Sequence, residues 1–475
     1  MSDNPSRSMP LELVRDDDAP LTAQEKKLLQ RCETMVAEGK EKVATGFVEI
    51  AEAFHQIREQ RLYRETHRSF AAYFHEKWGY GRAHANRLAD DGQMIADLSP
   101  QGDILQAMTS DAHFRPLSSL QEKEQRIQVI HLAQQWLAWK QEPTVPPALI
   151  RSARAFAFPP QDASPPDDES QALVRKFTAI VEEERKKLPG GTSKEVRGFL
   201  NRIVDRVSEL DRPRSSTGIA WTEATWNPLQ GCAHVSAGCD RCYAAKFVAT
   251  RAADLYPGLA VGKTGSDGVK RYRFTNKIVL LPEDLGQPLQ DRTPKRFFVN
   301  SMSDLFHAKV PDDFIEAVFK VMEKAHWHQY QVLTKRPERM ADFSRNYFKR
   351  REPPPHIWLG TSVENQEAFD LRIGHLRKTK AAVRWLSCEP LLGSVRFDSP
   401  EGIGWVVVGG ESDSNRPMEK VWATSIRDQC AKAKIPYFFK QWGSYDEEGN
   451  GPRKESHDPP PMLDGKIHHE YPGIQ

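Results

Sequence analysis

Three of the six cysteines in the sequence lie within eleven residues of one another, on the stretch WNPLQGCAHVSAGCDRCYAAKF. They are Cys232, Cys239 and Cys242. Thiolates gathered in this way are ligands for zinc or for an iron–sulfur cluster. For zinc, His234 would complete a Cys3His set, whereas three thiolates on a [4Fe–4S] cluster leave one iron open to a further ligand. We favour the cluster over zinc, and both over three unrelated buried thiols, because the loop is polar and contains glycine.

The segment from Thr217 onward alternates short apolar runs with helix-like stretches. This alternation predicts an α/β domain with a parallel sheet and right-handed crossovers, open or closed into a partial barrel. The seven expected strands lie within residues 219–232, 296–301, 330–335, 356–362, 383–390, 404–412 and 437–443. The three-cysteine loop follows the first of these strands, so it lies at the carboxyl end of the predicted sheet.

The expected strands end in polar or charged residues. Because the carboxyl ends of parallel strands share one face, and that face carries the active site in βα folds, these residues predict a ligand-binding or catalytic rim. The candidate catalytic residues are Asp304, Lys335 and Glu389. The candidate cofactor-binding residues are Asn300, Ser301, Gly409, Gly410 and Glu411. The alternatives are structural ion pairs for the charged side chains and a tight turn for the two glycines.

This arrangement resembles that of radical S-adenosylmethionine enzymes, in which three cysteines follow the first strand of a partial βα barrel. The resemblance implies a [4Fe–4S] cluster on Cys232, Cys239 and Cys242, with S-adenosylmethionine bound at the open iron. It also implies reductive cleavage to a 5′-deoxyadenosyl radical and a reductant for the cluster. The family spacing is C-x3-C-x2-C, whereas this chain has C-x6-C-x2-C. Gly409-Gly410-Glu411 resembles the segment with which these enzymes bind the cofactor's amino group.

The chain also resembles a phage and mobile-element family of three-cysteine proteins whose function is largely uncharacterised. The similarity covers about residues 217–445 and implies that this barrel is a unit. It rests on the motifs WTEATWNPLQGC, GCDRCYA, FFVNSMSDLFH, QVLTKRPERM, WLGTSVENQ, SCEPLLG, VVGGES and FFKQWG.

Residues 21–141 have a helical pattern that contains the outline of a helix-turn-helix. The stretch SFAAYFHEKWGYGRAHANRLADDGQMIADL predicts two helices joined by a turn at residues 78–81. It resembles helical N-terminal modules of phage and plasmid proteins, several of which are thought to bind DNA. The alternative is an ordinary helical hairpin with a solvated face. The candidate nucleic-acid contacts are Arg82, His84, Asn86 and Arg87.

The overall composition limits the remaining choices. Lys and Arg number 67 against 65 Asp and Glu, so attraction to nucleic acid must come from a local patch. The start of the chain lacks the apolar segment of a secretory signal, and no apolar run is long enough to span a membrane. We therefore expect a cytoplasmic protein without membrane partners. The segments outside the two domains are predicted as a disordered tail (1–20), a Pro-rich linker (142–170), a helical arm (171–211) and a flexible tail (446–475).

Two functional hypotheses follow. In the first, the chain is a radical enzyme that modifies a nucleic-acid base or a nucleotide, and residues 1–211 target it to its substrate. In the second, it is a DNA-binding regulator of a mobile element whose metal domain, with zinc or an iron–sulfur cluster, is structural or sensory. The polar and charged residues at the strand ends favour the first hypothesis, because a regulator would not need a catalytic rim.

Overall fold

A computed structural model of the chain divides into two compact units. The first contains Met1–Pro159 and Pro282–Gly286, and the second contains Pro160–Leu281 and Gln287–Gln475. The structure describes residues 20–41, 46–99, 104, 105, 107–140, 145–159, 217–253, 256–266, 268–397, 399–412, 416–451 and 461–473. The predicted helical arm, and all but the last residue of the predicted N-terminal tail, lie outside these residues.

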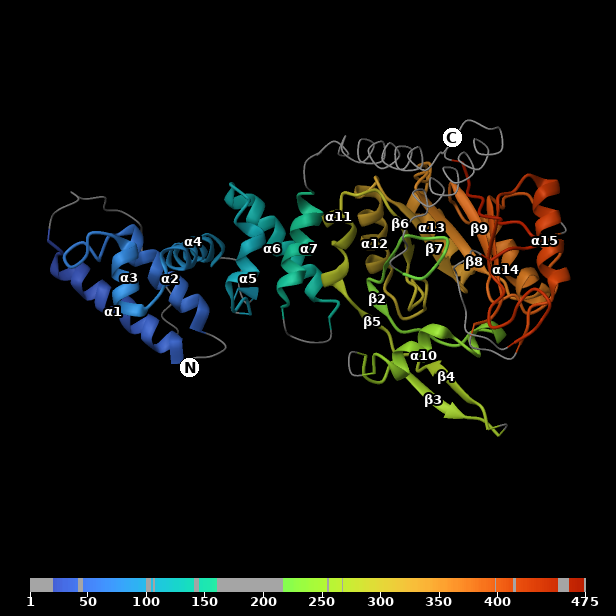
Figure 1. Ribbon diagram of the computed structural model, residues 1–475. Helices are drawn as coiled ribbons and strands as arrows, with labels where there is room; N and C mark the ends of the chain where they lie inside the picture. The colour runs from blue at the N-terminus through green and yellow to red at the C-terminus, as the bar shows by residue number, and fades with distance from the viewer. Residues whose placement is uncertain are drawn as a thin grey trace, which may run out of the picture. The chain divides into compact units, whose positions relative to one another are not determined.

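The N-terminal unit is helical, as predicted (Figure 1). Its aromatic core centres on Phe54 and Phe74, whose rings lie 3.9 Å apart and are fully buried. The helices are α1 (Ala23–Glu41), α2 (Gly46–Glu59), α3 (Phe70–Trp78), α4 (Arg82–Leu98), α5 (Asp111–Phe114), α6 (Lys123–Leu137) and α7 (Pro147–Ala157).

The predicted turn between two helices is confirmed at α3 and α4. The Ser69 hydroxyl caps the start of α3 by accepting a hydrogen bond from the Ala72 N–H. Gly79 ends the helix in the left-handed conformation, with φ of 76°, where a side chain would be strained. Gly81 then precedes the first residue of α4. The local sequence therefore specifies both helix boundaries.

Helix α7 corrects the expectation of an unstructured linker over residues 142–170. Pro147 lies at the first position of this helix, where the missing N–H has no intrahelical partner to lose. Leu149 and Ile150 are fully buried. The prolines at this point start a helix, whereas the composition suggested that they prevent one.

The second unit is a parallel half-barrel, which confirms the expected α/β class. Among the described residues, its sheet has seven parallel strands in the order β1-β6-β7-β8-β9-β10-β11. These are β1 (Ala224–Trp226), β6 (Arg296–Val299), β7 (Gln329–Thr334), β8 (Ile357–Ser362), β9 (Val383–Cys388), β10 (Trp405–Gly409) and β11 (Tyr437–Gln441). All seven lie within the predicted segments or begin one residue earlier.

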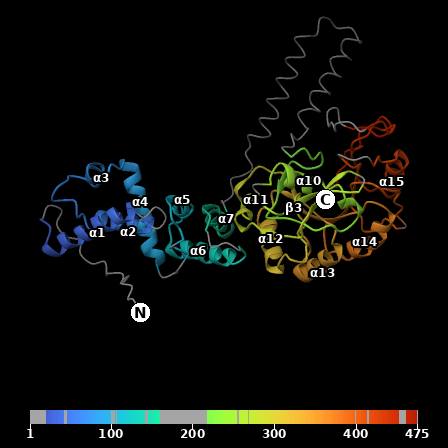
Figure 2. The same ribbon diagram turned by 90° about the horizontal axis from the view of Figure 1, so that it is seen from below.

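Helices cover the outer face of this sheet. Figure 2 shows them in an arc, with α10 and β3 on its inner side. The covering helices are α11 (Gln287–Gln290), α12 (Asp312–Lys324), α13 (Pro337–Phe348), α14 (Gln366–Lys378) and α15 (Lys420–Ala433). None of the helices in the described ranges is both long and apolar enough to cross a membrane.

Tryptophans fill the inner face of the half-barrel. Trp221, Trp358, Trp385 and Trp405 form one buried cluster with Phe298, Val407 and Phe438. Gly360 leaves room for this cluster, because a Cβ there would lie 2.5 Å from the Trp385 ring. The strand tryptophans are therefore core residues. They fill the inside of the half-barrel, which leaves the carboxyl edge of the sheet as the place for a ligand.

The described C-terminal segment, residues 461–473, packs against the same cluster and corrects the expectation of a flexible tail from 446. The Tyr471 ring stacks on Trp405 with 5.5 Å between centroids, and His469 stacks on Phe438 at 4.3 Å. The Trp405 indole N–H donates to the Glu470 carbonyl at 2.8 Å. The segment is mostly polar, so its composition predicted a flexible tail. Its few aromatic residues nevertheless make the contacts that hold it against the barrel.

Two small sheets were not anticipated. Strands β2 (Leu229–Gln230) and β5 (Val279–Leu280) form an antiparallel pair beside the cysteine loop. Strands β3 (Ala260–Thr264) and β4 (Lys270–Phe274) form an antiparallel ribbon next to α10 (Tyr243–Thr250), as Figure 1 shows.

Candidate functional site at the carboxyl edge of the half-barrel

The three-cysteine loop lies between β2 and α10. Cys232 comes shortly after β2, Cys239 ends a short 3-10 helix, and Cys242 immediately precedes α10. All three are free thiols and are partly exposed. Gly231, with φ of 90°, allows the chain to enter the loop, because a Cβ there would overlap the Lys277 carbonyl oxygen at 2.0 Å. The loop is thus anchored at both ends by regular structure.

The environment of two of these thiols favours their protonated form. Burial raises the pKa of Cys232 to about 12; the Asp304 carboxylate adds to this effect and Arg336 opposes it. Burial also raises the pKa of Cys242, although hydrogen bonds from the N–H groups at the start of α10 lower it in part. A metal bound by these thiols would therefore have to displace protons, as metal binding to cysteine does in general.

The donor set is chemically suited to an iron–sulfur cluster, but it is not preassembled. In the part of the chain that the structure describes, no three His, Cys, Asp or Glu side chains converge as a metal-binding group. His234, the expected fourth ligand for zinc, instead contacts Asp240 at 2.9 Å. Cluster binding by Cys232, Cys239 and Cys242 would require the loop to draw the three sulfurs together.

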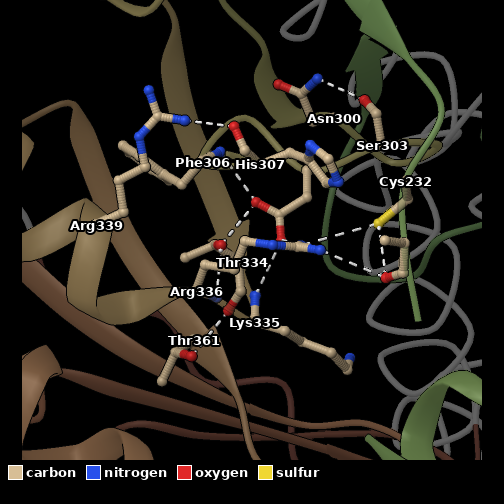
Figure 3. A network of polar contacts seen from close by, with 12 residues as sticks. Cys232, Asn300, Ser303, Phe306, His307, Thr334, Lys335, Arg336, Arg339 and Thr361 are labelled. Carbon is tan, nitrogen blue, oxygen red and sulfur yellow. Dashed lines mark hydrogen bonds and ion pairs between the residues drawn. The ribbon is translucent and has the colours of Figure 1, made fainter. Parts of the chain in front are cut away.

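A polar network that includes Thr334 and Arg336 lies beside Cys232 (Figure 3). Asp304 joins its members. Its carboxylate accepts hydrogen bonds from the Thr334 hydroxyl at 2.7 Å and from the Phe306 N–H at 3.0 Å. It also pairs with Arg336 at 2.5 Å. The Arg336 guanidinium in turn lies 4.0 Å from the Cys232 sulfur. Asp304 therefore has structural partners at both oxygens, and its observable role is to position Arg336 against the cysteine loop.

Lys335 differs from the other two predicted catalytic residues, because its charged group has no ion-pair partner among the described residues. Figure 3 shows its side chain extending away from the Asp304 network. Its ammonium group makes no ion pair or hydrogen bond with any described residue, although its charge helps to lower the pKa of Glu364 against the effect of burial. An unpaired cation at a strand end suits the carboxylate or phosphate of a ligand.

Glu389 lies at the end of β9 and is already paired. Its carboxylate contacts the Lys440 ammonium at 2.9 Å and accepts a hydrogen bond from the Trp221 indole N–H at 3.1 Å. Trp221 belongs to the tryptophan cluster, so this hydrogen bond joins the ion pair to the core of the half-barrel. The structural ion pair, which the sequence left as an alternative, therefore accounts for Glu389 and Lys440.

Glu411 is buried at the end of β10, where Arg416 binds both of its oxygens. Arg416 also donates to the Ala237 carbonyl of the cysteine loop at 3.3 Å and approaches Asp240 at 3.9 Å. The pair links β10 to the loop. An ammonium group of a ligand would have to compete with Arg416 for this carboxylate.

Close packing explains the two glycines before Glu411. A Cβ at Gly410 would lie 2.0 Å from the Trp442 carbonyl oxygen, and one at Gly409 would lie 2.8 Å from a Glu389 oxygen. The contact with the backbone makes glycine necessary at position 410 even in the absence of a ligand, whereas the Gly409 contact is with the end of a side chain. The tight-turn alternative therefore suffices for this segment.

Asn300 and Ser301 directly follow β6. Asn300 has a positive φ of 66° and donates to the Ser303 hydroxyl at 2.6 Å. Its side-chain oxygen is buried and has no partner among the described residues. The Ser301 carbonyl accepts a hydrogen bond from the Tyr243 hydroxyl at 2.8 Å. Of the predicted cofactor-binding residues, Asn300 thus retains an unused polar atom.

Residues 216–472 match a protein family described as a protein of unknown function (DUF5131). The chain belongs to this family. The match begins one residue before the predicted start of the barrel and extends past its predicted end at 445, so it includes Tyr471, which packs on Trp405. No curated protein and no solved structure matches the chain.

Sequence reasoning missed two members of this site in the DUF5131 domain, Arg416 and Arg372. Arg372 projects from α14 and forms a buried ion pair with Glu364 at 2.9 Å. Neither arginine belongs to a strand end, which was the signal used to choose candidates. A buried acidic residue at a strand end does predict a cationic partner, but it cannot indicate which one.

The candidate nucleic-acid contacts in the N-terminal unit are distributed differently. Arg82 and Arg87 are exposed on the first turns of α4. His84 and Asn86 are half-buried, and the His84 ring lies 5.0 Å from that of Tyr80. Of these four candidates, Arg82 and Arg87 are thus the two whose side chains are exposed to solvent.

Proposed function

We propose that the DUF5131 domain is an iron–sulfur enzyme of the radical S-adenosylmethionine type that modifies a nucleic-acid base or a nucleotide. We further propose that it originates from a phage or another mobile element. One observation carries the enzymatic proposal. Three free thiols share a loop at the carboxyl edge of a parallel half-barrel, the edge at which βα folds place their active sites. A buried network of charged side chains supports that loop.

The protein's own residues have separable roles in this proposal. Cys232, Cys239 and Cys242 would hold the cluster, which supplies an electron for cleavage of the cofactor's sulfonium. Arg336 lies beside the first thiol and offsets negative charge there. Lys335, which has no partner among the described residues, would bind the cofactor's carboxylate. The tryptophan cluster beneath closes the inner face of the barrel to water.

The proposal predicts a cluster on the purified protein. After anaerobic reconstitution, the full chain should hold about four irons and four sulfides, as a [4Fe–4S] cluster contains. The triple variant Cys232→Ala/Cys239→Ala/Cys242→Ala should hold none. Iron and sulfide analysis with EPR spectroscopy measures both. The control is Cys32→Ala/Cys430→Ala, which removes buried thiols from α1 and α15 and should retain the cluster. One equivalent of zinc without a cluster would overturn the proposal in favour of a structural or sensory metal domain.

A second prediction concerns the cofactor. S-adenosylmethionine should change the EPR spectrum of the reduced cluster, and 5′-deoxyadenosine should accumulate. Lys335→Met should weaken cofactor binding about ten-fold, because a charge-assisted hydrogen bond to the carboxylate is lost. Iron content should not change, and Lys378→Met on the exposed end of α14 is the control. If the EPR spectrum of the cluster does not change when S-adenosylmethionine is added, the proposed radical chemistry is refuted. The proposed cluster site would still stand.

A further inference from the structure

A marked excess of positive charge lies directly after the cysteine loop in the sequence. The whole chain has a formal net charge of +2, whereas residues 241–277 alone contain eight cationic side chains and two aspartates. The cationic residues are Arg241, Lys246, Arg251, Lys263, Lys270, Arg271, Arg273 and Lys277. A local patch of this kind attracts a polyanion even though the protein as a whole is nearly neutral.

The β3–β4 ribbon displays much of this charge on one face. Opposite residues of an antiparallel pair share a face, and Lys263 pairs with Arg271 as Val261 pairs with Arg273. Lys263 and Val261 are exposed, and the Arg273 side chain is 53% exposed. Lys263, Arg271 and Arg273 therefore share one face of the ribbon with Val261, which lies opposite Arg273.

The cationic face is continuous with the cysteine loop. Arg273 forms an ion pair at 3.0 Å with Asp240, which lies between Cys239 and Cys242. Helix α10, which starts at Tyr243, packs against the ribbon, as Figure 1 shows. A strand of nucleic acid bound along the ribbon would therefore run toward the three thiols.

We propose that the β3–β4 ribbon, with α10, binds the phosphate backbone of a nucleic acid and delivers it to the carboxyl edge of the half-barrel. A two-stranded ribbon has the width to enter the major groove of a duplex, and its exposed cations also suit a single strand. This binding names the substrate class of the proposed enzyme. It does not itself require the cluster, so the two proposals can fail separately.

A charge reversal tests the surface. Lys263→Glu changes an exposed residue of the ribbon, so the protein should keep its thermal midpoint. Binding to a labelled 20-nucleotide duplex or single strand, measured by fluorescence anisotropy, should weaken about ten-fold at 100 mM salt. The slope of log K against log salt should fall in magnitude by about 1 to 2. The matched control is Lys378→Glu on α14, which makes the same change in net charge at an exposed position.

The measurements use the full chain carrying Arg82→Ala/Arg87→Ala, so that α4 contributes no phosphate contacts. Equal binding by the Lys263→Glu and Lys378→Glu proteins would overturn the proposal. Competition by polyglutamate as effective as that of the oligonucleotide would overturn it too, since the surface would then suit an acidic protein. The triple cysteine variant should bind nucleic acid normally. Loss of binding there would place the contact on the cysteine loop and refute the assignment to the ribbon.

Discussion

Replacing Asp304 with alanine should destabilise the half-barrel by about 3–5 kcal/mol, the usual effect of removing one partner from a buried ion pair. The Asp304 side chain is 6% exposed and the Arg336 side chain 19%, so neither charge can be solvated in place. The substitution leaves Arg336 without its carboxylate and removes the acceptor for the Thr334 hydroxyl. Chemical denaturation followed by the fluorescence of the buried tryptophan cluster measures the change.

A matched surface pair provides the control. Asp312 pairs with Arg339, but the Asp312 side chain is 75% exposed. Asp312→Ala should therefore change the free energy of unfolding by less than about 0.5 kcal/mol. The double variant Asp304→Ala/Arg336→Met should recover at least half of the lost stability, because no buried charge remains unpaired. If Asp304→Ala and Asp312→Ala have the same effect, the network does not support the cysteine loop.

The N-terminal helices should become more stable at neutral pH when Asp91 is replaced by asparagine. Asp91 lies on α4, is 3% exposed and has a carboxylate oxygen without a partner among the described residues. Burial, together with the charges of Asp111 and Asp90, raises its pKa from 3.8 to about 7. The folded state therefore holds a proton that the unfolded state has already released.

The sign of the pH dependence follows from this shift. Below pH 3.8 both states are protonated and the carboxyl adds no pH dependence. As the pH rises to about 7, the unfolded state ionises first, so stability falls by up to about 4 kcal/mol in total. Asp91→Asn should match the parent near pH 4 and exceed it by that amount at pH 8. Glu76→Gln, which removes a carboxylate from an 80% exposed side chain on α3 and leaves the charges around Asp91 unchanged, is the control. Equal pH dependence in the Asp91→Asn protein and its parent would contradict the prediction.

Local sequence was sufficient for the strands of the half-barrel sheet and for the long helices that cover it. Six of the seven strands of the half-barrel sheet lie in apolar runs that end in polar residues, whereas β1 is three residues of a longer, mixed segment. The long helices between the strands show the helical period of apolar residues. The turn at Gly79 could be predicted from the sequence, because helices often end at a residue in the left-handed conformation and glycine is favoured there. The β3–β4 ribbon was missed because its strands are short and largely polar, so alternation gives no signal there.

The sequence by itself determined which residues reach the carboxyl edge of the half-barrel, because strand periodicity and parallel topology place strand ends on one face. Only the tertiary structure decided what each residue does there. Glu389 and Glu411 are held by Lys440 and Arg416, while Lys335 remains without a partner among the described residues. The reason is physical: a buried charge must be paired, but its partner is chosen by contacts in space between segments far apart in the chain.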